Sequence, residues 1–453
     1  MKIRNTVILL FIFVVLAGYV YIVEVKQHSK KEKAEEKAKK VFTMPKDSVN
    51  TLKIRNANGE FLLKKVDQDW EISTPLETEA DGSTINSMLT SLFGATKESV
   101  FDVQPPQMAQ YGLTDQAVKV QVEDKLGEQD SLRLGDKTPV GANVFAAKTD
   151  TSIFTVSQSI KSQFEKKLFD IRDKKMLHFK RADVRTITIK NPHGTITIDK
   201  DGSSDWKLKN IDRAADNSKV SSLLSKLENN RVKAFVDENG RELKKYGLTR
   251  PAFQVGLDLG QDLGQRNLMI SKKLNGKYYG KDEDRKPIFE IDSSLVKDVK
   301  EKVADFRSKD LASFNRSEVD RIMISYADTL FSCLKDTSDE WWLDEIGGKP
   351  LDKSKIQSFF SSLDYTNIAE FIKDGNIEPA KYGLSKPSLQ ISLYNGEDMI
   401  IQVKLGKIVG DNVYALTNKY DSVYLIPKTK IKDLKLKLDN IMKVEKPESQ
   451  TAS

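Results

Sequence analysis

The side chains most suited to chemistry in this 453-residue chain are three histidines, one cysteine and many carboxylates. His28, His178 and His193 are the only histidines, and their spacing forms neither a His-rich metal cluster nor an HExxH motif. The chain also lacks a Walker A loop, a GxGxxG loop and a GxSxG sequence. We therefore expect no catalytic residue, no bound cofactor and no metal site, and the protein is predicted not to be an enzyme.

The single cysteine, Cys333, lies in a strand-like run from Leu330 to Leu334. One cysteine cannot form an internal disulfide, and an apolar strand favours a buried structural thiol over a nucleophile. Carboxylates are more numerous, with 66 Asp and Glu residues, and none of their possible pairs stands out. A glycosidase-like acid pair therefore has no specific support in the sequence.

Three aspartates, Asp81, Asp216 and Asp352, recur at matched positions and could be three catalytic groups. Each is followed by apolar residues at offsets of four, seven, eight and eleven, which form one stripe of an amphipathic helix. Aspartate is strongly favoured at the residue before a helix, where its carboxylate accepts free backbone N–H groups. We interpret the three aspartates as helix caps.

Three tryptophans, Trp70, Trp206 and Trp342, stand 136 residues apart, and similar residues surround each of them. A spacing this regular indicates one unit written three times. Each tryptophan lies in a short strand-like run, so we interpret all three as core anchors. A second interpretation, as stacking platforms for a sugar or a base, stays open because aromatic side chains also serve that use.

A Tyr-Gly-Leu sequence also occurs three times, at intervals of 135 and 136 residues. Glycine adopts positive φ at little steric cost, and alternating apolar and polar residues typical of half-buried strands follow, so these sequences predict turns. The turn residues are Tyr111, Gly112, Tyr246, Gly247, Tyr382 and Gly383.

The sequence pattern of each copy thus predicts strands, a capped helix, a turn, more strands and a closing helix, in that order. The fold class is α+β, with three tandem repeats of about 135 residues, each a mostly antiparallel sheet with two helices. The linkers are not rich in Gly, Pro or Ser, which favours repeats stacked into an elongated body. The predicted parts are a short basic N-terminus (1–5), an anchor (6–23), a charged stalk (24–46), repeat 1 (47–173), repeat 2 (174–308), repeat 3 (309–443) and a disordered tail (444–453).

Residues Thr6 to Val23 form an uncharged, mostly apolar run that is long enough to span a bilayer as a signal-anchor helix. Lysines after this run oppose an extracytoplasmic body under the positive-inside rule. Two observations favour an extracytoplasmic body: a short basic segment precedes the run, and long domains are translocated largely regardless of their charge. We therefore expect a single-pass protein of the bacterial inner membrane, with the bulk of the chain extracytoplasmic.

The net charge of +7 is concentrated near this run, because residues 1–46 contain ten Lys or Arg and four Glu. The rest of the chain has a net charge of only +1. Nucleic-acid binding needs a basic face, so no nucleic-acid partner is expected. The charged stalk suggests a spacer that lies beside the membrane.

These motifs together resemble the bacterial domain-of-unknown-function family 4340. The resemblance rests on the anchor, the Trp-x-Ile/Leu strands, the capping aspartates, the Tyr-Gly-Leu turns and a Leu-Gly strand end, and it covers about residues 46–443. In the middle copy, Ser271 stands where Gly135 and Gly406 end their strands. The resemblance implies no catalytic residues. It implies an association with ABC-type transport systems of the gliding-motility kind, of which family members are called auxiliary components.

We therefore expect a non-enzymatic accessory or scaffold subunit of an ABC-type transport or envelope-assembly complex, with a protein partner in the envelope. Two other classes stay open. One is a glycan- or lipid-binding module that uses clefts between repeats, with Trp341, the extra aromatic of the third copy, as the possible ligand contact. The other is an envelope hydrolase, which would need an acid pair confined to one copy. Any site is expected where the copies differ.

Overall fold

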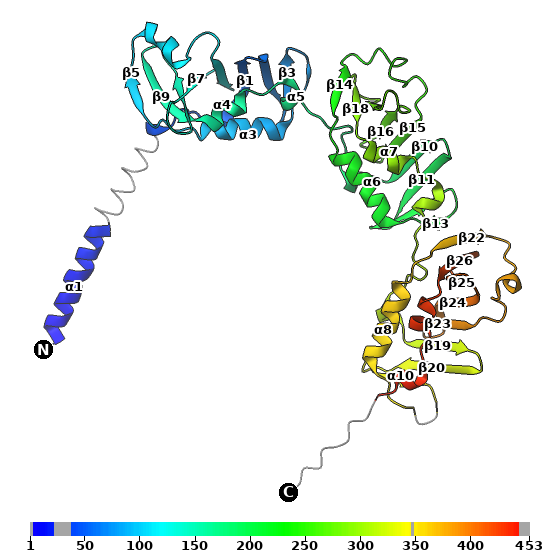
Figure 1. Ribbon diagram of the computed structural model, residues 1–453. Coiled ribbons are helices and arrows are strands. Elements are labelled where there is room, and N and C mark those ends of the chain that lie inside the picture. Colours follow the sequence, from blue (N-terminus) through cyan, green and yellow to red (C-terminus); the bar gives the residue numbers. More distant parts are fainter. Residues whose placement is uncertain (1–2, 22–37, 346–347, 444–453) are drawn as a thin grey trace. The chain divides into compact units, whose positions relative to one another are not determined.

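The computed structural model describes residues 3–21, 38–345 and 348–443 (Figure 1). The predicted tail (444–453), His28 and most of the predicted stalk lie outside these residues. Helix α1 runs from Ile3 to Val20, and the predicted span continues to Val23, beyond the described part. Among the described residues, no helix is both long enough and apolar enough to cross a membrane. The membrane-spanning helix therefore stays a prediction.

Three antiparallel sheets, one in each copy, make up most of the described chain. The strand orders are β4-β3-β2-β1-β6-β7-β8-β9-β5, then β13-β12-β11-β10-β15-β16-β17-β18-β14, then β21-β20-β19-β23-β24-β25-β26-β22. In each sheet, the strands before the main helix form one half and the strands after the Tyr-Gly-Leu turn form the other. The short strand that follows the helix lies at the far edge. This arrangement confirms the predicted α+β class with three copies.

The elements of the first copy are η2 (Lys46–Ser48), β1 (Val49–Asn56), β2 (Gly59–Val66), β3 (Asp69–Thr74), β4 (Thr78–Glu79), α3 (Gly82–Phe93), β5 (Val100–Asp102), η3 (Pro105–Tyr111), β6 (Val118–Asp124), β7 (Gln129–Lys137), β8 (Asn143–Ala147), β9 (Ser152–Ser157), α4 (Gln158–Phe164) and α5 (Leu168–Ile171).

Those of the second copy are η4 (Arg181–Asp183), β10 (Thr186–Asn191), β11 (Gly194–Asp201), β12 (Asp205–Leu208), β13 (Arg213–Ala214), α6 (Asn217–Asn229), β14 (Ala234–Asp237), β15 (Phe253–Asp258), β16 (Gln265–Ile270), β17 (Tyr278–Asp282), β18 (Ile288–Ile291), α7 (Ser293–Val299) and η5 (Val303–Phe306).

Those of the third copy are η6 (Arg316–Glu318), β19 (Arg321–Tyr326), β20 (Thr329–Lys335), β21 (Trp341–Leu343), α8 (Lys353–Asp364), β22 (Glu370–Asp374), η7 (Pro379–Tyr382), β23 (Leu389–Asn395), β24 (Asp398–Val409), β25 (Asn412–Thr417), β26 (Ser422–Pro427), α9 (Lys430–Leu434) and α10 (Leu438–Ile441).

The contacts within the chain define two compact units, which share the middle copy. Unit 1 consists of Met1–Arg181, Ser225–Gln254 and Arg266–Val296. Unit 2 consists of Ala182–Leu224, Val255–Gln265 and Lys297–Ser453. Each linker between successive copies therefore packs within one unit, the first linker in unit 1 and the second in unit 2.

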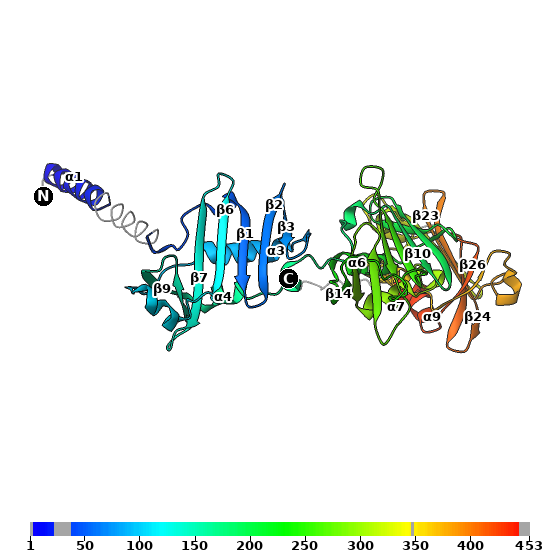
Figure 2. The ribbon, with the colours of Figure 1, turned by 90° about the horizontal axis from the view of Figure 1, so that it is seen from above.

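The main helix of each copy covers one face of its sheet with the apolar stripe that the sequence predicts. Helix α3 lies across the strands β7, β6, β1, β2 and β3 (Figure 2). Each side chain buried in this way contributes about 1.5–3 kcal/mol relative to exposure. The buried stripe residues are Ile85, Met88, Leu89 and Leu92 in α3, Val220, Leu223, Leu224 and Leu227 in α6, and Ile356, Phe359, Phe360 and Leu363 in α8.

The three recurring aspartates cap these helices, as predicted. The Asp81 carboxylate accepts the backbone N–H of Thr84 at 3.0 Å, and the Asp352 carboxylate accepts that of Ser354 at 2.9 Å. The Asp216 carboxylate likewise accepts the N–H of Lys219 at 3.0 Å. Each cap stabilises its helix by about 1 kcal/mol, so the aspartates have a structural use in every copy.

The glycine of each Tyr-Gly-Leu turn adopts a left-handed conformation, with φ of 66° at Gly112, 69° at Gly247 and 73° at Gly383. In the first and third copies, a second glycine packs against the tyrosine carbonyl of this turn. A Cβ atom would stand 2.2 Å from that oxygen at Gly135 and 2.1 Å from it at Gly406. Glycine is therefore required at both places.

Ser271 replaces this second glycine in the middle copy. Strand β16 ends at Ile270, just before the serine, whereas β7 and β24 continue past Gly135 and Gly406. Its hydroxyl donates a hydrogen bond to the Lys272 carbonyl at 2.7 Å and accepts one from the Tyr279 N–H at 3.0 Å. The serine is fully buried, so both bonds satisfy a polar group that would otherwise be costly. This departure between copies is accounted for by local structure.

The tryptophan register differs from the prediction in the third copy. Trp70, Trp206 and Trp341 each lie opposite a lysine of the preceding strand, and these lysines are 135 residues apart: Lys65, Lys200 and Lys335. Trp341 is 1% exposed and belongs to the core, whereas Trp342 is 38% exposed. Successive side chains of a strand point to opposite faces, so only one of two adjacent tryptophans can be the core anchor.

The first copy begins earlier than the predicted boundary at residue 47. Val41 and Phe42 are each 1% exposed and belong to the core of this copy. The Val41 N–H donates to the Ala95 carbonyl at 3.1 Å, and the Lys97 N–H donates to the Lys39 carbonyl at 2.7 Å. The last residues assigned to the stalk are therefore part of the folded copy.

Candidate functional site

An arginine in the first linker clamps the segment after α5 to strand β14 within unit 1. Arg172 is 2% exposed, and its guanidinium donates to both carboxylate oxygens of Glu238, at 2.7 and 3.0 Å. The same group lies over the Phe235 ring, 3.4 Å from its centroid. Charge-assisted, bidentate bonds of this kind are among the stronger polar contacts in proteins.

The second linker has the same clamp within unit 2. Arg307 donates to both oxygens of Asp374, at 2.9 and 3.1 Å, and its guanidinium carbon lies 3.8 Å from the centroid of Phe371. In the third copy, Met442 occupies the equivalent position, since it bridges Leu351 as Arg172 bridges Ala80. Within the described residues, the clamp arginine occurs only where another copy follows.

A polar cleft borders each linker, and the two clefts are built from corresponding residues. The backbone shows the correspondence: the Asp173 N–H donates to Glu79 O, and the Ser308 N–H donates to Ala214 O, both at 2.9 Å. One cleft, which we call the first cleft, is lined by residues that include Trp70, Glu79, Asp173, His178, Asp282 and Arg285. The second cleft is the one around Trp206, Ala214, Ser308, Ser313, Thr417 and Tyr420.

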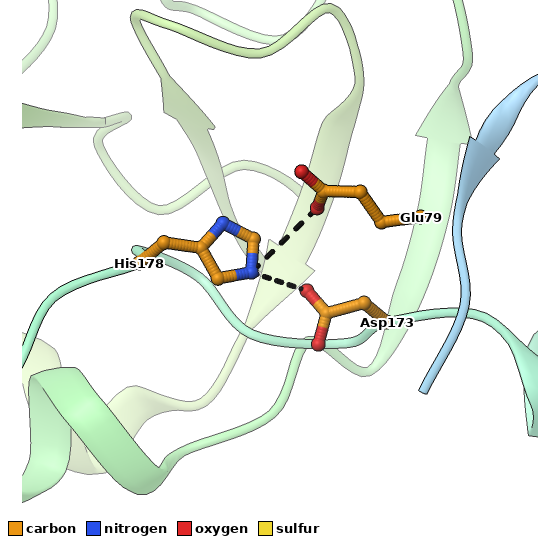
Figure 3. A group of neighbouring side chains, drawn as sticks. All are labelled: Glu79, Asp173 and His178. Carbon is orange, nitrogen blue, oxygen red and sulfur yellow. Dashed lines mark hydrogen bonds and ion pairs between the residues drawn. The ribbon is translucent and has the colours of Figure 1, made fainter. Parts of the chain in front are cut away.

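Three potential metal ligands meet in the first cleft. Glu79 ends strand β4, while Asp173 and His178 lie on the linker, and Figure 3 shows the imidazole facing both carboxylates. The His178 Nε2 atom is 2.8 Å from the Asp173 Oδ2 and 3.6 Å from the Glu79 Oε2. The nearest ligand atoms of the three residues all lie within 4.8 Å of one another.

Neighbouring groups hold this cluster in place. The Arg266 Nε donates to the carbonyl oxygen of His178 at 3.1 Å. The Lys175 N–H lies 3.3 Å from both carboxylate oxygens of Asp173. Arg285 donates to the Lys175 carbonyl at 2.8 Å and extends toward the cluster, 3.4 Å from Glu79 and 3.6 Å from Asp173. The linker backbone is therefore fixed on both sides of the histidine.

Two carboxyl groups of the first cleft titrate differently. Burial alone would raise the pKa of Asp173, but hydrogen bonds from His178 and the Lys175 N–H, together with the Arg285 charge, hold this pKa below its usual range. Burial raises the pKa of Asp282, against a weaker opposing bond from the Asp284 N–H. Asp173 is therefore ionised at neutral pH and can accept a proton or bind a cation, but it cannot serve as a proton donor.

The second cleft lacks this chemistry. Ala214, Ser308 and Ser313 stand where the first cleft has Glu79, Asp173 and His178, and Tyr420 stands where it has Arg285. The Tyr420 hydroxyl accepts a hydrogen bond from the Ala214 N–H at 3.3 Å. The Arg213 guanidinium lies over the Tyr420 ring, 4.7 Å from its centroid. At the place of the Glu-Asp-His cluster, the second cleft thus has a neutral hydrogen bond and a stacking contact, while the charged Arg307–Asp374 clamp is kept.

The structure uses most of the predicted site residues for the fold. The prediction of Trp341 as a possible ligand contact is wrong, because this side chain is buried. The exposed neighbour, Trp342, donates its indole N–H to the Asp336 carboxylate at 2.7 Å. Trp70 and Trp206 are each only 7% exposed, which leaves little ring surface for stacking on a sugar or a base. Cys333 is fully buried, and burial raises the pKa of its thiol to about 12, as expected for a structural thiol.

The mixed Glu-Asp-His group is the feature that sequence reasoning missed. Neither a His-rich cluster nor an HExxH motif describes this group, because one histidine meets carboxylates located 5 and 99 residues earlier in the chain. A comparison of the three copies position by position could have found it. Glu79 corresponds to Ala214 and Pro350, and Asp173 corresponds to Ser308 and Lys443, as the matching backbone bonds show.

The fold and linkers define a tandem-repeat α+β protein with one cleft at each linker. The chain belongs to the family described as Domain of unknown function (DUF4340), whose family model matches residues 70–235, 206–376 and 341–445. The three matches start at Trp70, Trp206 and Trp341, which agrees with the strand register. No curated protein matches the chain. A DNA polymerase sliding clamp from Pseudomonas aeruginosa, solved with a ligand, is aligned over 86% of this chain and 94% of its own, at 8% identity and a TM-score of 0.17, too low to carry an argument.

Proposed function

We propose that this protein is a membrane-anchored, non-enzymatic scaffold, an accessory subunit of an ABC-type transport or envelope-assembly complex with its repeats outside the cytoplasm. The observation that carries the proposal is the use of the recurring residues. Caps, turns, core tryptophans and linker arginines all serve to build and join copies, which is the pattern of an interaction scaffold. The apolar segment Thr6–Val23 supports the anchor.

A cross-linking experiment in the native bacterium tests this role. A chain with a C-terminal affinity tag would be cross-linked in cells, solubilised from membranes and purified, and its partners identified by mass spectrometry. We expect a membrane subunit of an ABC transporter or an envelope-assembly protein. A matched chain that lacks residues 1–23 should lose this partner. Recovery of the full chain without any such partner would contradict the proposal.

The side of the membrane needs its own test. In spheroplasts, added protease should remove a C-terminal epitope if the body is extracytoplasmic. A cytoplasmic marker protein must stay intact in the same sample. An epitope that is degraded only after detergent lysis would place the body in the cytoplasm and overturn the proposed location.

The second candidate is an envelope hydrolase that acts through the first cleft. It has one specific observation in its favour, because Glu79 and Asp173 form an acid pair confined to one copy, beside His178. Because the pKa of Asp173 is lowered, this residue would have to be the base or nucleophile of such a pair, and Glu79 would have to be the acid. Incubation with purified cell-wall glycan, with a Glu79→Gln chain as control, would detect such an activity. Equal, null turnover by both chains would dispose of it.

The remaining alternative is a glycan- or lipid-binding module. The low exposure of Trp70 and Trp206 in their clefts argues against glycan stacking, which needs an accessible aromatic face. Sedimentation of the full chain with glycan particles would test this class. Strong binding that persists in a Trp342→Ala chain would require a surface other than the exposed tryptophan.

A further inference from the structure

We propose that Glu79, Asp173 and His178 bind one divalent transition-metal ion of the zinc class in the first cleft. The donor set contains one imidazole nitrogen and two carboxylate oxygens, which are ligand types that zinc uses in proteins. Three protein ligands leave a fourth position for water. The inference does not depend on the proposed scaffold role, so either can fail without the other.

The distances fit such an ion. Zinc bonds of about 2.0–2.1 Å in tetrahedral geometry place neighbouring donor atoms about 3.3–3.4 Å apart. The two distances from the His178 Nε2, 2.8 Å to Asp173 and 3.6 Å to Glu79, lie on either side of that value. The three ligand atoms all lie within 4.8 Å of one another. Glu79 can make the remaining adjustment, because its side chain is 53% exposed and its contact with Arg285 is as long as 3.4 Å.

The three ligand side chains differ in exposure, and the most exposed of them leaves a path by which an ion can enter. The Asp173 side chain is 11% exposed and that of His178 is 37% exposed, while Glu79 is the most open of the three. The backbone of both inner ligands is also held by bonds that do not use their ligating atoms, from the Asp173 N–H to the Glu79 carbonyl and from Arg266 to the His178 carbonyl. Pre-positioned inner ligands reduce the ordering cost of binding.

The charge of the cleft favours a cation. The first cleft is lined by seven Asp or Glu residues and four Lys or Arg residues, whereas the second cleft is lined by five of each. Arg285 is the competing charge. Its distances of 3.4 and 3.6 Å to the carboxylates exceed the 2.7–2.9 Å of a charge-assisted hydrogen bond, and its firm bond goes to the Lys175 carbonyl.

The ion would join strand β4 to the first linker. Glu79 lies at the end of β4, and Asp173 and His178 lie before the second copy begins its own sheet. The backbone bond from Asp173 to Glu79 already joins these segments, and metal ligation would add side-chain bonds to it. Because the second cleft has Ala214, Ser308 and Ser313 at the same places, the protein contains its own matched control.

Zinc titration of the full-length protein tests the proposal. The chain, purified in detergent with a tag free of histidine and stripped with EDTA, would be titrated with zinc chloride in competition with a chromophoric chelator. We expect one equivalent per chain. Glu79→Gln and His178→Gln should each weaken the affinity at least tenfold, about the loss seen when metal-site partners are changed. Ser308→Ala with Ser313→Ala, in the second cleft, should leave it unchanged.

A further variant separates ligation from a purely structural role. Arg285→Gln removes the competing positive charge and should tighten zinc binding several-fold. Circular dichroism of every variant would verify that the chain still folds. Absence of zinc binding by the wild-type chain would overturn the proposal. So would an affinity in both the Glu79→Gln and the His178→Gln chains that equals that of the wild type.

Discussion

The two linker clefts have the same framework and different contents. In both, an arginine clamps the linker to an edge strand of the next sheet, and a backbone bond joins the linker to the short strand before the main helix. Around the first linker, a carboxylate pair, a histidine and Arg285 gather. Around the second, small residues and Tyr420 take their places.

This difference separates what repetition preserves from what it leaves free to vary. Residues that build the copy recur because each copy must bury its own core and attach to its neighbour. The side chains that line the cleft do not have to recur in this way. The second copy has Ala214 in place of Glu79 and still makes the same backbone bond to the linker. The first cleft is therefore where function would be expected to distinguish one copy from another.

The largest expected effect tests the register that defines corresponding residues. Trp341→Ala should lower the free energy of unfolding by about 3–5 kcal/mol, because it removes a buried ring from the third core. Trp342→Ala should cost less than about 1 kcal/mol, since that ring is partly exposed and loses one surface bond. Urea unfolding of both chains checks this. If Trp342→Ala lost more stability than Trp341→Ala, the register of the third copy would be shifted by one residue. The assignment of corresponding residues between the copies would then be wrong.

The shared clamp should respond equally in the two linkers. Arg172→Ala and Arg307→Ala should each cost about 2–3 kcal/mol locally, less than a fully buried pair because the acidic partners are partly exposed. The backbone amides of Asp173 and Ser308 should then exchange roughly 30 to 150 times faster with deuterated water.

Arg55→Ala is the control for the clamp. This arginine is paired with Glu60 on the surface, so its loss should change exchange very little. A large effect at only one linker would mean that the two clamps are not equivalent, and the framework of the two clefts would no longer be common.

The smallest expected effect is an acid sensitivity specific to the first cleft. Because the pKa of Asp173 is lowered in the folded protein, its stabilising effect is complete above the unfolded pKa of about 3.9. It is lost as the pH falls through the lower, folded value. In EDTA, Asp173→Asn should therefore reduce stability at pH 6 and approach the wild type in acid.

The matched chain for this prediction is Ser313→Ala, which changes a non-titrating residue of the second linker. Ser308 is unsuitable as this control because its hydroxyl donates to the Asp310 carboxylate at 2.9 Å. The difference between the Ser313→Ala chain and the wild type should not vary with pH. Urea midpoints measured from pH 3 to pH 6 check both chains. A pH-independent effect of Asp173→Asn would mean that the histidine and arginine do not stabilise the ionised carboxylate.

Local patterns were sufficient to predict most of the scaffold. The capping aspartates, the apolar helix stripes and the glycines at positive φ all follow from short-range rules, and repetition verified each of them three times. The tryptophan register failed because Trp341 and Trp342 are adjacent, and equal spacing selected the wrong one. Only the strand pairing with Lys335 and the burial of each ring distinguish them.

The Glu-Asp-His group could not be predicted in the same way. Glu79 meets Asp173 because the linker returns to β4, and His178 meets both because Arg266 and Lys175 fix the turn of the linker. No short-range pattern encodes such a return of the chain. The expectation that any site would lie where the copies differ stays a prediction, and the Glu-Asp-His group is a candidate of that kind because all three residues change between copies.

The first cleft should contain a cation site that the second cleft lacks. Anomalous X-ray scattering at the zinc edge, from crystals of the full-length protein grown with zinc, tests it most directly. We predict one anomalous peak within about 2.2 Å of Glu79, Asp173 and His178, and none beside Ala214, Ser308 and Ser313. A first cleft without a peak, or equal peaks in both clefts, would contradict the proposed zinc site.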